Sequence, residues 1–419
     1  MKALKKVSLT NQIMVAMVLG IVVGLLVGPS IAPIRVLGDL FLRLIQMSVV
    51  VLIMGAVIEA VGTLDPRELG KLGGKMALWF IGGTLLAGAL GIILSFIIQP
   101  GAGLDVTLDT AASFESGGES LTDVILGFVP TNVVSAMAEA NMIQVIIFSL
   151  FFGLSISMLS LKHDLSALTN GIKQFNVVIL QIIKLVMNVA PIGIFALLAW
   201  VTGTIGFAVI IPLAKFLLTM GLGTIIFMFI WILVTASYVK VSPIRLAKNL
   251  TRMTVVAFTT TSSAITLPVK MEDQERKLGV SKRISRLVGP LGMAMNSNGL
   301  SLYLSIAAIT LAQFYGLEIT VMNAVEIVAL STLATLGTVV VPGGGLVALA
   351  IVIPALGLPL ESIALLAGID WFSGMFRTVL NVDADATIAM ILAYDEGEFD
   401  REAFNSDNYN DDVVEAERV

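Results

Sequence analysis

Cysteine is absent from this 419-residue chain, and His163 is its only histidine. The chain therefore has no disulfide, thiolate metal site or thiol nucleophile, and one histidine excludes a histidine metal cluster or a histidine-based triad. Charged residues are also scarce at 13%, whereas hydrophobic residues make up 57%. A soluble domain has about 25% charged and about 45–50% apolar residues. These proportions predict a protein embedded in lipid, and they give no support for nucleic-acid binding.

Long hydrophobic runs predict membrane-spanning helices. Each run lacks charged residues and reaches or exceeds the roughly 20 residues that cross the hydrocarbon layer. The runs are residues 7–34, 76–104, 140–161, 185–214, 216–239, 287–317 and 327–360. Because hydrocarbon offers backbone groups no other partner, we expect these runs to be helical. The first run is long for a signal peptide and is interpreted as a transmembrane helix.

Basic residues mark the cytoplasmic side of a membrane protein. They cluster at the N-terminus, 67–75, 240–252 and 270–286. Residues 100–123 are acidic and rich in Gly, Ser and Thr, as expected outside the cell. The helices that alternate between these marks are expected at 8–32, 36–60, 75–99, 121–161, 165–203 and 207–239. Both termini are expected in the cytoplasm of a cell-membrane protein, with a polar, disordered tail over 394–419.

This alternation breaks at residues 253–269, an apolar run with basic clusters on both sides. A segment that enters and leaves by one face is a re-entrant hairpin. Its centre, Thr259 to Ser263, carries hydroxyls that can satisfy a turning backbone at membrane depth. The alternative is a single spanning helix rich in Ser and Thr.

A second hairpin, entering from outside, is predicted at 327–360, which has acidic flanks. Val341 to Gly345 cut this run, because Pro followed by three Gly stops a helix and exposes backbone amides. A glycine hinge in one continuous helix is the alternative. Each hairpin precedes a helix, at 287–317 and 362–393, which makes an inverted repeat. Such repeats place a substrate site near the bilayer midplane, where the N-termini of interrupted helices attract anions.

Two of these segments carry polar groups where a membrane helix should be apolar. The helix over 287–317 is expected to break at Asn296 to Gly299, which are poor helix formers. In the last helix, five positions lie within about 80° of one another at 100° per residue. They are Asp370, Gly374, Arg377, Asn381 and Asp385.

Ionisable groups in a membrane face a cavity or a partner. The guanidinium of Arg377 fits a carboxylate bidentately, which predicts an anion site. The alternative is that Arg377 only pairs with Asp370 or Asp385 and locks the bundle. Asp383 points away from this face and is expected at a helix end or an interface.

The order of these motifs resembles the dicarboxylate/amino acid:cation symporters, the glutamate transporter family, from about residue 8 to 393. The motifs are Thr-Ser-Ser before Thr266-Leu267-Pro268, Asn-x-x-Gly at Asn296 to Gly299, Val-Pro-Gly-x-Gly at Val341 to Gly345, and Gly-Ile-Asp followed by Arg-Thr and Asn-Val. The resemblance implies an all-α homotrimer with eight transmembrane helices and two re-entrant hairpins. It implies an elevator in which a scaffold, 1–70 and 121–203, holds a moving transport domain, 75–99 and 207–393.

The resemblance also implies roles for single residues. Its substrate contacts are Ser262 and Ser263 in the inner hairpin, the backbone of Val341 and Gly343 in the outer gate, Arg377 for the distal carboxylate and Asn381 for polar substrate atoms. Gly374 stands where amino-acid carriers of the family place an aspartate for the substrate ammonium. An amino group would lose its counter-charge there, which favours an anion without an amine. Thr261 also departs from the arginine or serine that is usual at its position.

The family's sodium sites are altered in this chain. Asn298 replaces the sodium-binding carboxylate of the Asn-Met-Asp-Gly-Thr motif, and Leu300 replaces the threonine. The tyrosine, threonine and serine that supply oxygens from helix three in the family are Phe80, Gly83 and Thr84 here, so the same site loses further ligands. Asp385, with carbonyls of Asn296 and Asn381, still matches another sodium site, and a backbone-built third would lie near Thr335 and Thr338. Asp385 or Asp370 could take a proton instead.

The sequence therefore predicts a secondary transporter of a small organic anion, a dicarboxylate, with altered or absent sodium coupling. The candidate coupling ions are Na⁺ and H⁺, and no other cofactor is expected. One alternative is a sodium-coupled acidic amino acid transporter, and another is an anion or solute channel on the same fold. An enzyme is not expected, because the chain has no cysteine and no membrane histidine to form a nucleophile–base pair. Asp370 and Asp385 would lie about 22 Å apart along one helix, too far to share a proton as an aspartyl dyad.

Overall fold

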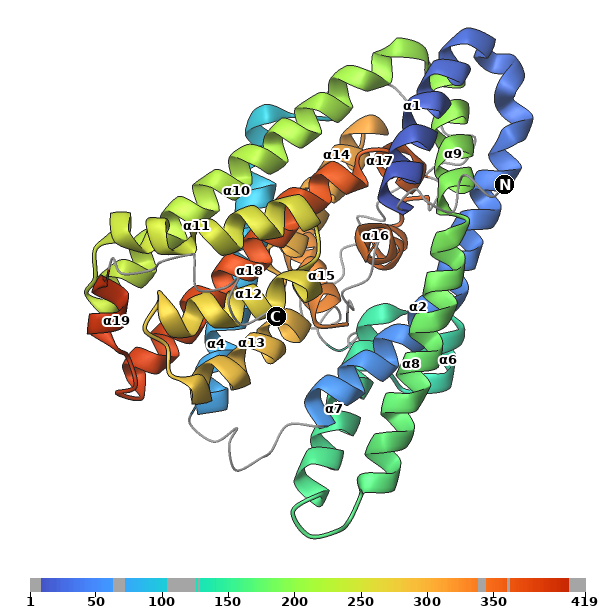
Figure 1. Cartoon of the computed structure of the whole chain (residues 1–419). Helices are drawn as coiled ribbons and strands as arrows, with labels where there is room; N and C mark the ends of the chain where they lie inside the picture. The colour runs from blue at the N-terminus through green and yellow to red at the C-terminus, as the bar shows by residue number, and fades with distance from the viewer. Residues whose placement is uncertain are drawn as a thin grey trace, which may run out of the picture.

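The computed structural model of the chain is a bundle of helices (Figure 1). It describes residues 9–62, 72–103, 126, 129–139, 141–337, 344–359 and 362–406. In this part of the chain the elements are helices, with one isolated antiparallel bridge between Val280 and Phe399. The predicted all-α class is therefore confirmed.

One group of helices, on the right of Figure 1, is built around α1, α2 and α7 to α9. Its elements are α1 (Leu9–Val27), η2 (Gly28–Ile34), α2 (Arg35–Gly62), α6 (Val133–Ala138), α7 (Met142–Leu159), α8 (Ser166–Asn188) and α9 (Ala190–Ile205). A Cβ added at Gly20 would lie 2.8 Å from the Phe195 carbonyl oxygen, and one at Gly24 would lie 2.4 Å from that of Ala199. Small residues one turn apart thus let α1 and α9 pack closely, as is common in membranes.

A second group surrounds α18, which crosses the left part of Figure 1. Its elements are α4 (Gly74–Ile98), η4 (Gly206–Val209), α10 (Ile210–Val239), α11 (Pro243–Thr260), α12 (Ser263–Arg276), α13 (Lys282–Met295), α14 (Asn298–Phe314) and α18 (Asp370–Asp395). α18 packs against α4 and against each of α10 to α14. From Thr378 to Ala393 all of its residues except Asn381 are buried. The polar residues of α18 therefore face protein rather than lipid.

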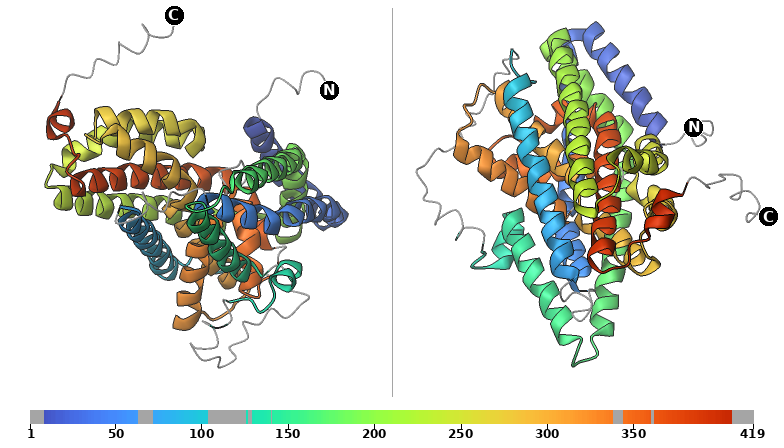
Figure 2. Two further views of the ribbon diagram at one scale, coloured as in Figure 1. Left: turned by 90° about the horizontal axis from the view of Figure 1, so that it is seen from below. Right: turned by 90° about the vertical axis from the view of Figure 1, so that its left-hand side faces the viewer.

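The remaining elements are α15 (Val321–Gly337), α16 (Gly344–Ala355), α17 (Ile363–Ala367) and α19 (Arg401–Asn405). α15 and α16 contact helices of both groups, and Figure 2 shows the two groups from two further sides. Two of the predicted helices are divided. The helix predicted over 121–161 is seen, where described, as α6 and α7, and the one over 165–203 is α8 and α9, bent by 51°.

Several helices suit a membrane by length and composition. Among the described residues, three stretches are long and apolar enough to cross it: Asn11–Leu44, Gly74–Ile98 and Ile210–Val239. The bent pair of α8 and α9 would be a fourth span. These helices support a multi-pass membrane protein, whereas the count of eight spans stays a prediction.

The predicted hairpins correspond to paired helices. α11 and α12 pack together and are joined at Thr261, whose φ is +50°, and Ser262. The chain therefore turns back here and does not continue as one helix. Its arms, α11 and α12, extend beyond the predicted 253–269 at both ends. Arg252 donates across the hairpin to Glu272 and Asp273, both at 3.0 Å, so residues outside the predicted run also hold the arms together. α15 and α16 also pack together, and their connection, 338–343, lies outside the described residues.

The helix predicted over 287–317 breaks as expected, since α13 ends at Met295 and α14 begins at Asn298. The prediction of a disordered tail from 394 onward is wrong for its first part. α18 continues to Asp395 and α19 follows it. Arg245 Nε donates to the Phe404 carbonyl at 2.9 Å, and this bond holds the segment against α11. Residues 407–419 lie outside the described part of the chain.

Candidate functional site

The candidate site begins at an ion pair on α18. Arg377 Nη1 lies 2.7 Å from Asp370 Oδ1, with side chains 11% and 9% exposed. Arg377 Nη2 also donates to the Asp370 carbonyl at 3.3 Å. The guanidinium lies over the Tyr303 ring of α14, 4.3 Å from its centroid, as a cation–π contact. The internal pairing considered for Arg377 is thus present, and its partner is Asp370, not Asp385.

The outer hairpin, formed by α15 and α16, reaches this pair through the start of α16. A Cβ added at Gly345, near the start of α16, would lie 1.9 Å from Arg377 Nη1 and 2.1 Å from Asp370 Oδ1. Only glycine leaves room for the two charged groups at this point. The predicted outer-gate residues Val341 and Gly343 lie outside the described residues, but α16 begins directly after them.

The inner hairpin approaches α18 from another side. A Cβ added at Gly374 would lie 3.4 Å from Arg377 Nη2 and 4.0 Å from Thr261 Cβ. Position 374 therefore faces the space between the guanidinium and the hairpin tip. Ser262 caps α12, because its Oγ accepts from Ile265 N at 3.3 Å, and Ser263 is 7% exposed.

The break before α14 meets the same stretch of α18. Gly299 N donates to Asn381 Oδ1 at 2.8 Å, so Asn381 satisfies one of the free amides at the start of α14. A Cβ added at Gly299 would lie 2.3 Å from the Arg377 carbonyl oxygen. The starts of α12, α14 and α16 thus all lie near Arg377 and its neighbours. Helix N-termini and a guanidinium together favour an anion such as a carboxylate.

A second polar centre lies further along α18. Asp385 Oδ2 is 2.7 Å from Lys270 Nζ of α12, and both side chains are 1% exposed. Lys270 Nζ also donates to the Gly289 carbonyl at 3.0 Å, and Asn296 Nδ2 donates to Asp385 Oδ1 at 2.7 Å. The assignment of Lys270 to a cytoplasmic basic cluster is therefore wrong. Its spacing from Ser263 and Thr266, seven and four residues, would have placed it on the buried face of α12.

Asn298 faces helix α4. Thr84 Oγ1 donates to Asn298 Oδ1 at 3.1 Å, whereas Asn298 Nδ2 is buried and has no partner among the described atoms. A Cβ added at Gly83 would lie 3.2 Å from both of these side-chain atoms of Asn298. Asn298 is neutral, so this corner lacks the charged oxygen that a buried sodium ion prefers.

Asp383 is not at an interface, which corrects the prediction. It is 1% exposed, and its Oδ2 accepts from Thr254 Oγ1 of α11 at 2.7 Å. Its other carboxylate oxygen is buried without a partner among the described atoms. The back of α18 meets the inner hairpin rather than lipid, so position on a helical wheel alone misplaces this residue.

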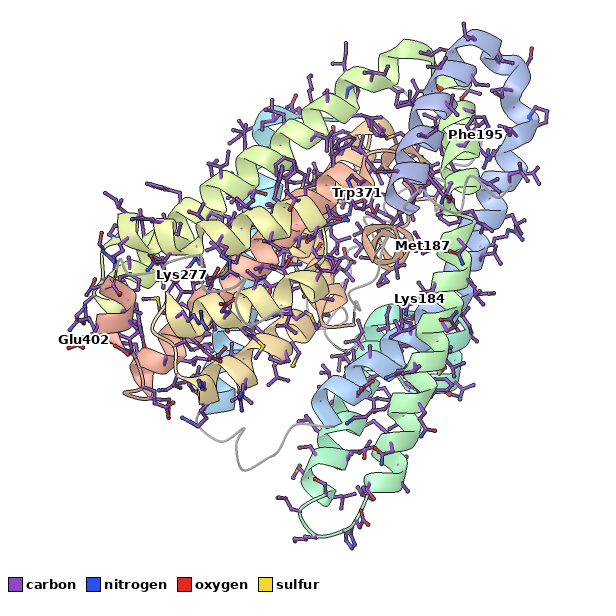
Figure 3. All side chains as sticks on the ribbon, in the orientation of Figure 1. Lys184, Met187, Phe195, Lys277, Trp371 and Glu402 are labelled. Atoms are coloured by element: carbon purple, nitrogen blue, oxygen red, sulfur yellow. The ribbon has the colours of Figure 1, made fainter. Side chains whose placement is uncertain are left out.

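Figure 3 shows how this geometry sits in the molecule. Trp371, next to Asp370, marks the start of α18 near α1 and α16, whereas Lys277 and Glu402 lie toward its other end. The N-terminal end of α18, which precedes Arg377, therefore lies nearer the first group of helices than the C-terminal end does.

Comparisons with known proteins cover almost the whole chain. Residues 9–394 match the sequence model of the sodium:dicarboxylate symporter family. The chain is 34% identical over 418 residues to the proton/glutamate-aspartate symporter of Escherichia coli (strain K12), covering 94% of each. It is 33% identical to the proton/sodium-glutamate symport protein of Bacillus subtilis (strain 168), again over 94% of each. It is 31% identical to the C4-dicarboxylate transport protein of Anaeromyxobacter sp. (strain K), over 94% of this chain and 91% of that protein.

Proposed function

Because this chain belongs to the sodium:dicarboxylate symporter family, and is therefore a membrane transporter and not an enzyme, we propose that it carries a small dicarboxylate without an amino group. The family resemblance predicted from the four motifs is confirmed by the same match. Relatives named for glutamate and aspartate and relatives named for C4-dicarboxylates are almost equally similar. Overall identity therefore does not distinguish between these substrates, so the proposal rests on the site residues.

The observation that carries the proposal is the space beside Gly374. It lies next to Arg377 Nη2 and the tip of the inner hairpin, and position 374 offers no carboxylate there. Asp370 is the nearest carboxylate on this face, and it is already paired with Arg377. One substrate carboxylate would bind Arg377, and the rest of the substrate would contact Ser262, Ser263 and Asn381. Among the described residues, an ammonium group in this space would find no free counter-charge.

Altered or absent sodium coupling is the second part of the proposal. A sodium ion in a buried site prefers oxygen ligands that include a full negative charge. The corner formed by Gly83, Thr84 and Asn298 offers one hydroxyl, one neutral amide and no carboxylate. These residues do not fit a sodium ion. Proton coupling and uncoupled transport remain as rivals within the proposal.

The transport cycle would be an elevator. The helices around α18, with both hairpins, would move as one body against the group of α1, α2 and α7 to α9, and three copies would form a trimer in the cell membrane. Packing supports this division, since α18 contacts α4 and α10 to α14. Both termini would face the cytoplasm. A channel on the same fold is the rival, and it would give flux that does not saturate with substrate.

Uptake by proteoliposomes tests the proposal. Labelled succinate and labelled aspartate are supplied with a sodium gradient, a proton gradient or neither. We expect saturable succinate uptake that is indifferent to sodium, and weak aspartate uptake. Sodium-driven aspartate uptake would contradict both parts of the proposal.

A matched pair of variants tests the role of position 374. Gly374→Asp should shift preference toward aspartate, about tenfold for each 1.4 kcal/mol of new interaction with the ammonium. Gly374→Asn has nearly the same shape without the charge and should not shift it. Equal effects of the two variants would remove Gly374 from the selectivity argument.

A further inference from the structure

Lys270 and Asp385 form a buried pair that connects three helices. The lysine comes from α12, the aspartate from α18, and Gly289, which accepts the second hydrogen bond of the ammonium, from α13. Asn296, at the end of α13, donates to the other oxygen of Asp385. Each carboxylate oxygen thus already has a donor, and one donor carries a full positive charge.

The surroundings of the ammonium have the chemistry of a cation site. A carboxylate and a main-chain carbonyl are the oxygen ligands that hard cations take from proteins, and here both bind Lys270 Nζ. A free cation at Asp385 would have to enter a buried site beside a group of the same sign, where like charges repel most strongly. The residues around Asp385 therefore do not fit a sodium ion, although this carboxylate matches a family sodium ligand.

We propose that Lys270 is a tethered cation that takes the place of a coupling sodium ion at Asp385. The consequence for uptake, that transport needs no sodium at this position, rests on the proposed function. The consequence for ion binding does not depend on any substrate.

The place of Lys270 on its helix gives the pair a role in transport. α12 begins at Ser263, a predicted substrate contact, and its buried face continues through Thr266 to Lys270. Asp385 lies eight residues after Arg377 on α18, about 12 Å along the helix. The pair therefore ties the inner hairpin to the helix that holds the anion site. An ion that came and went would make and break this tie, whereas a lysine makes it a permanent part of the chain.

Thermal unfolding of the purified full chain tests the proposal. Midpoints are measured in sodium chloride and in choline chloride of equal concentration. The wild type should give the same midpoint in both salts. Lys270→Ala should unfold at a lower temperature in choline chloride and recover part of the loss, with saturation, as sodium is added, because sodium can then neutralise Asp385.

Two further variants complete the test. Lys277→Ala is the matched control, because Lys277 pairs with Asp273 at 3.3 Å at the far end of the same helix (Figure 3), and it should show no response to sodium. The double variant Lys270→Ala/Asp385→Asn removes both charges and should fold without a sodium response, because the carboxylate that would bind sodium is gone. If Lys270→Ala alone does not fold, the response of the wild type and of Asp385→Asn to sodium still tests the proposal.

The proposal is overturned by either of two results. One is saturable stabilisation of the wild type by sodium that Asp385→Asn removes. The other is a folded Lys270→Ala variant that does not respond to sodium. A chain that fails to transport succinate would contradict the proposed function and leave these readouts unchanged.

Discussion

At the scale of single residues, Arg377 has two competing partners. In this structure its guanidinium is neutralised by Asp370, with Nη1 on the carboxylate and Nη2 on the carbonyl of the same residue. An arginine has five N–H donors, and Nη2 also faces the space over Gly374. A substrate carboxylate can therefore share the guanidinium or displace Asp370 from it. In both cases Asp370 weakens the attraction between Arg377 and the substrate.

Two variants of this pair should separate its roles. Removing one partner of a buried ion pair costs about 3–5 kcal/mol, so Arg377→Ala and Asp370→Asn should both unfold at lower temperature than the wild type without substrate. Added succinate should restore stability to Asp370→Asn more than it stabilises the wild type, because the unpaired guanidinium gains a carboxylate. It should leave Arg377→Ala unchanged. The measurement is the thermal unfolding midpoint of the wild type and of both variants as succinate is added.

The double variant Arg377→Ala/Asp370→Ala is the control, since it leaves no unpaired charge and should lose the succinate response without the full loss of stability. Stabilisation of Arg377→Ala by succinate equal to that of the wild type would remove Arg377 from the anion site.

The sequence was informative where polar residues recur at helical spacing on one face of a helix. Asp370, Arg377, Asn381 and Asp385 were predicted to share a face of α18, and the structure brings each to a polar partner. Lys270 was not predicted as part of the site, because it begins a run of charged residues that is typical of a cytoplasmic loop. Its partner is 115 residues away, and only the fold brings them together. Charge patterning reports the average environment of a segment, and a single buried ion pair is an exception to it.

At the scale of elements, the end of α18 is joined to the start of α13. Arg283 donates to Glu398 Oε1 through Nε at 2.9 Å and Nη2 at 2.6 Å, and Ser281 Oγ donates to Oε2. The bridge between Val280 and Phe399 lies beside these contacts. The segment after α18 therefore holds the start of α13 against the end of α18.

This junction should weaken in acid. The hydrogen bonds from Arg283 and Ser281 lower the pKa of Glu398 below its ordinary value of 4.5. A carboxyl whose pKa falls on folding stabilises the folded state above its unfolded pKa, and that contribution is lost as pH falls through the folded pKa. Glu398→Gln should therefore lower the unfolding midpoint at neutral pH, and the difference from the wild type should vanish below the folded pKa.

Glu402→Gln is the control for this prediction, because Glu402 is exposed on the neighbouring α19. Its difference from the wild type should be smaller at neutral pH. A Glu398→Gln difference that persists unchanged in acid would show that the junction depends on shape and not on charge.

The hairpins show what element patterns can and cannot predict. Basic flanks and central hydroxyls predicted the turn between α11 and α12, which the structure places at Thr261 and Ser262. The lengths of the arms were not predictable, because Arg252 and Asp273 look like loop residues until they pair with each other. Similarly, the ordered segment 395–406 is polar in sequence and becomes fixed only through contacts with distant residues such as Arg245.

At the scale of the whole molecule, an elevator requires the two groups of helices to slide past each other. One place where they meet is at α17, which leads into α18 and packs on α9. A Cβ added at Gly368, between α17 and α18, would lie 2.6 Å from Leu198 Cδ1 and 3.1 Å from Leu198 Cγ. Two cysteines at these positions would have Cβ atoms near the roughly 3.5–4.5 Å that a disulfide spans. The native chain has no cysteine, so an introduced pair has no competitor.

Oxidation of Gly368→Cys/Leu198→Cys should therefore stop succinate uptake, and a reductant should restore it, because the cross-link fixes the moving group to the scaffold. Gly62→Cys/Ile156→Cys is the matched control, since its Cβ atoms would lie 3.5 Å apart but both belong to the first group of helices. Oxidation should leave uptake by this control intact. If uptake continued when the first pair was fully cross-linked, α17 and α9 would not separate during transport. The moving body would then have to be smaller than the whole group around α18, with the hairpins alone as the gates.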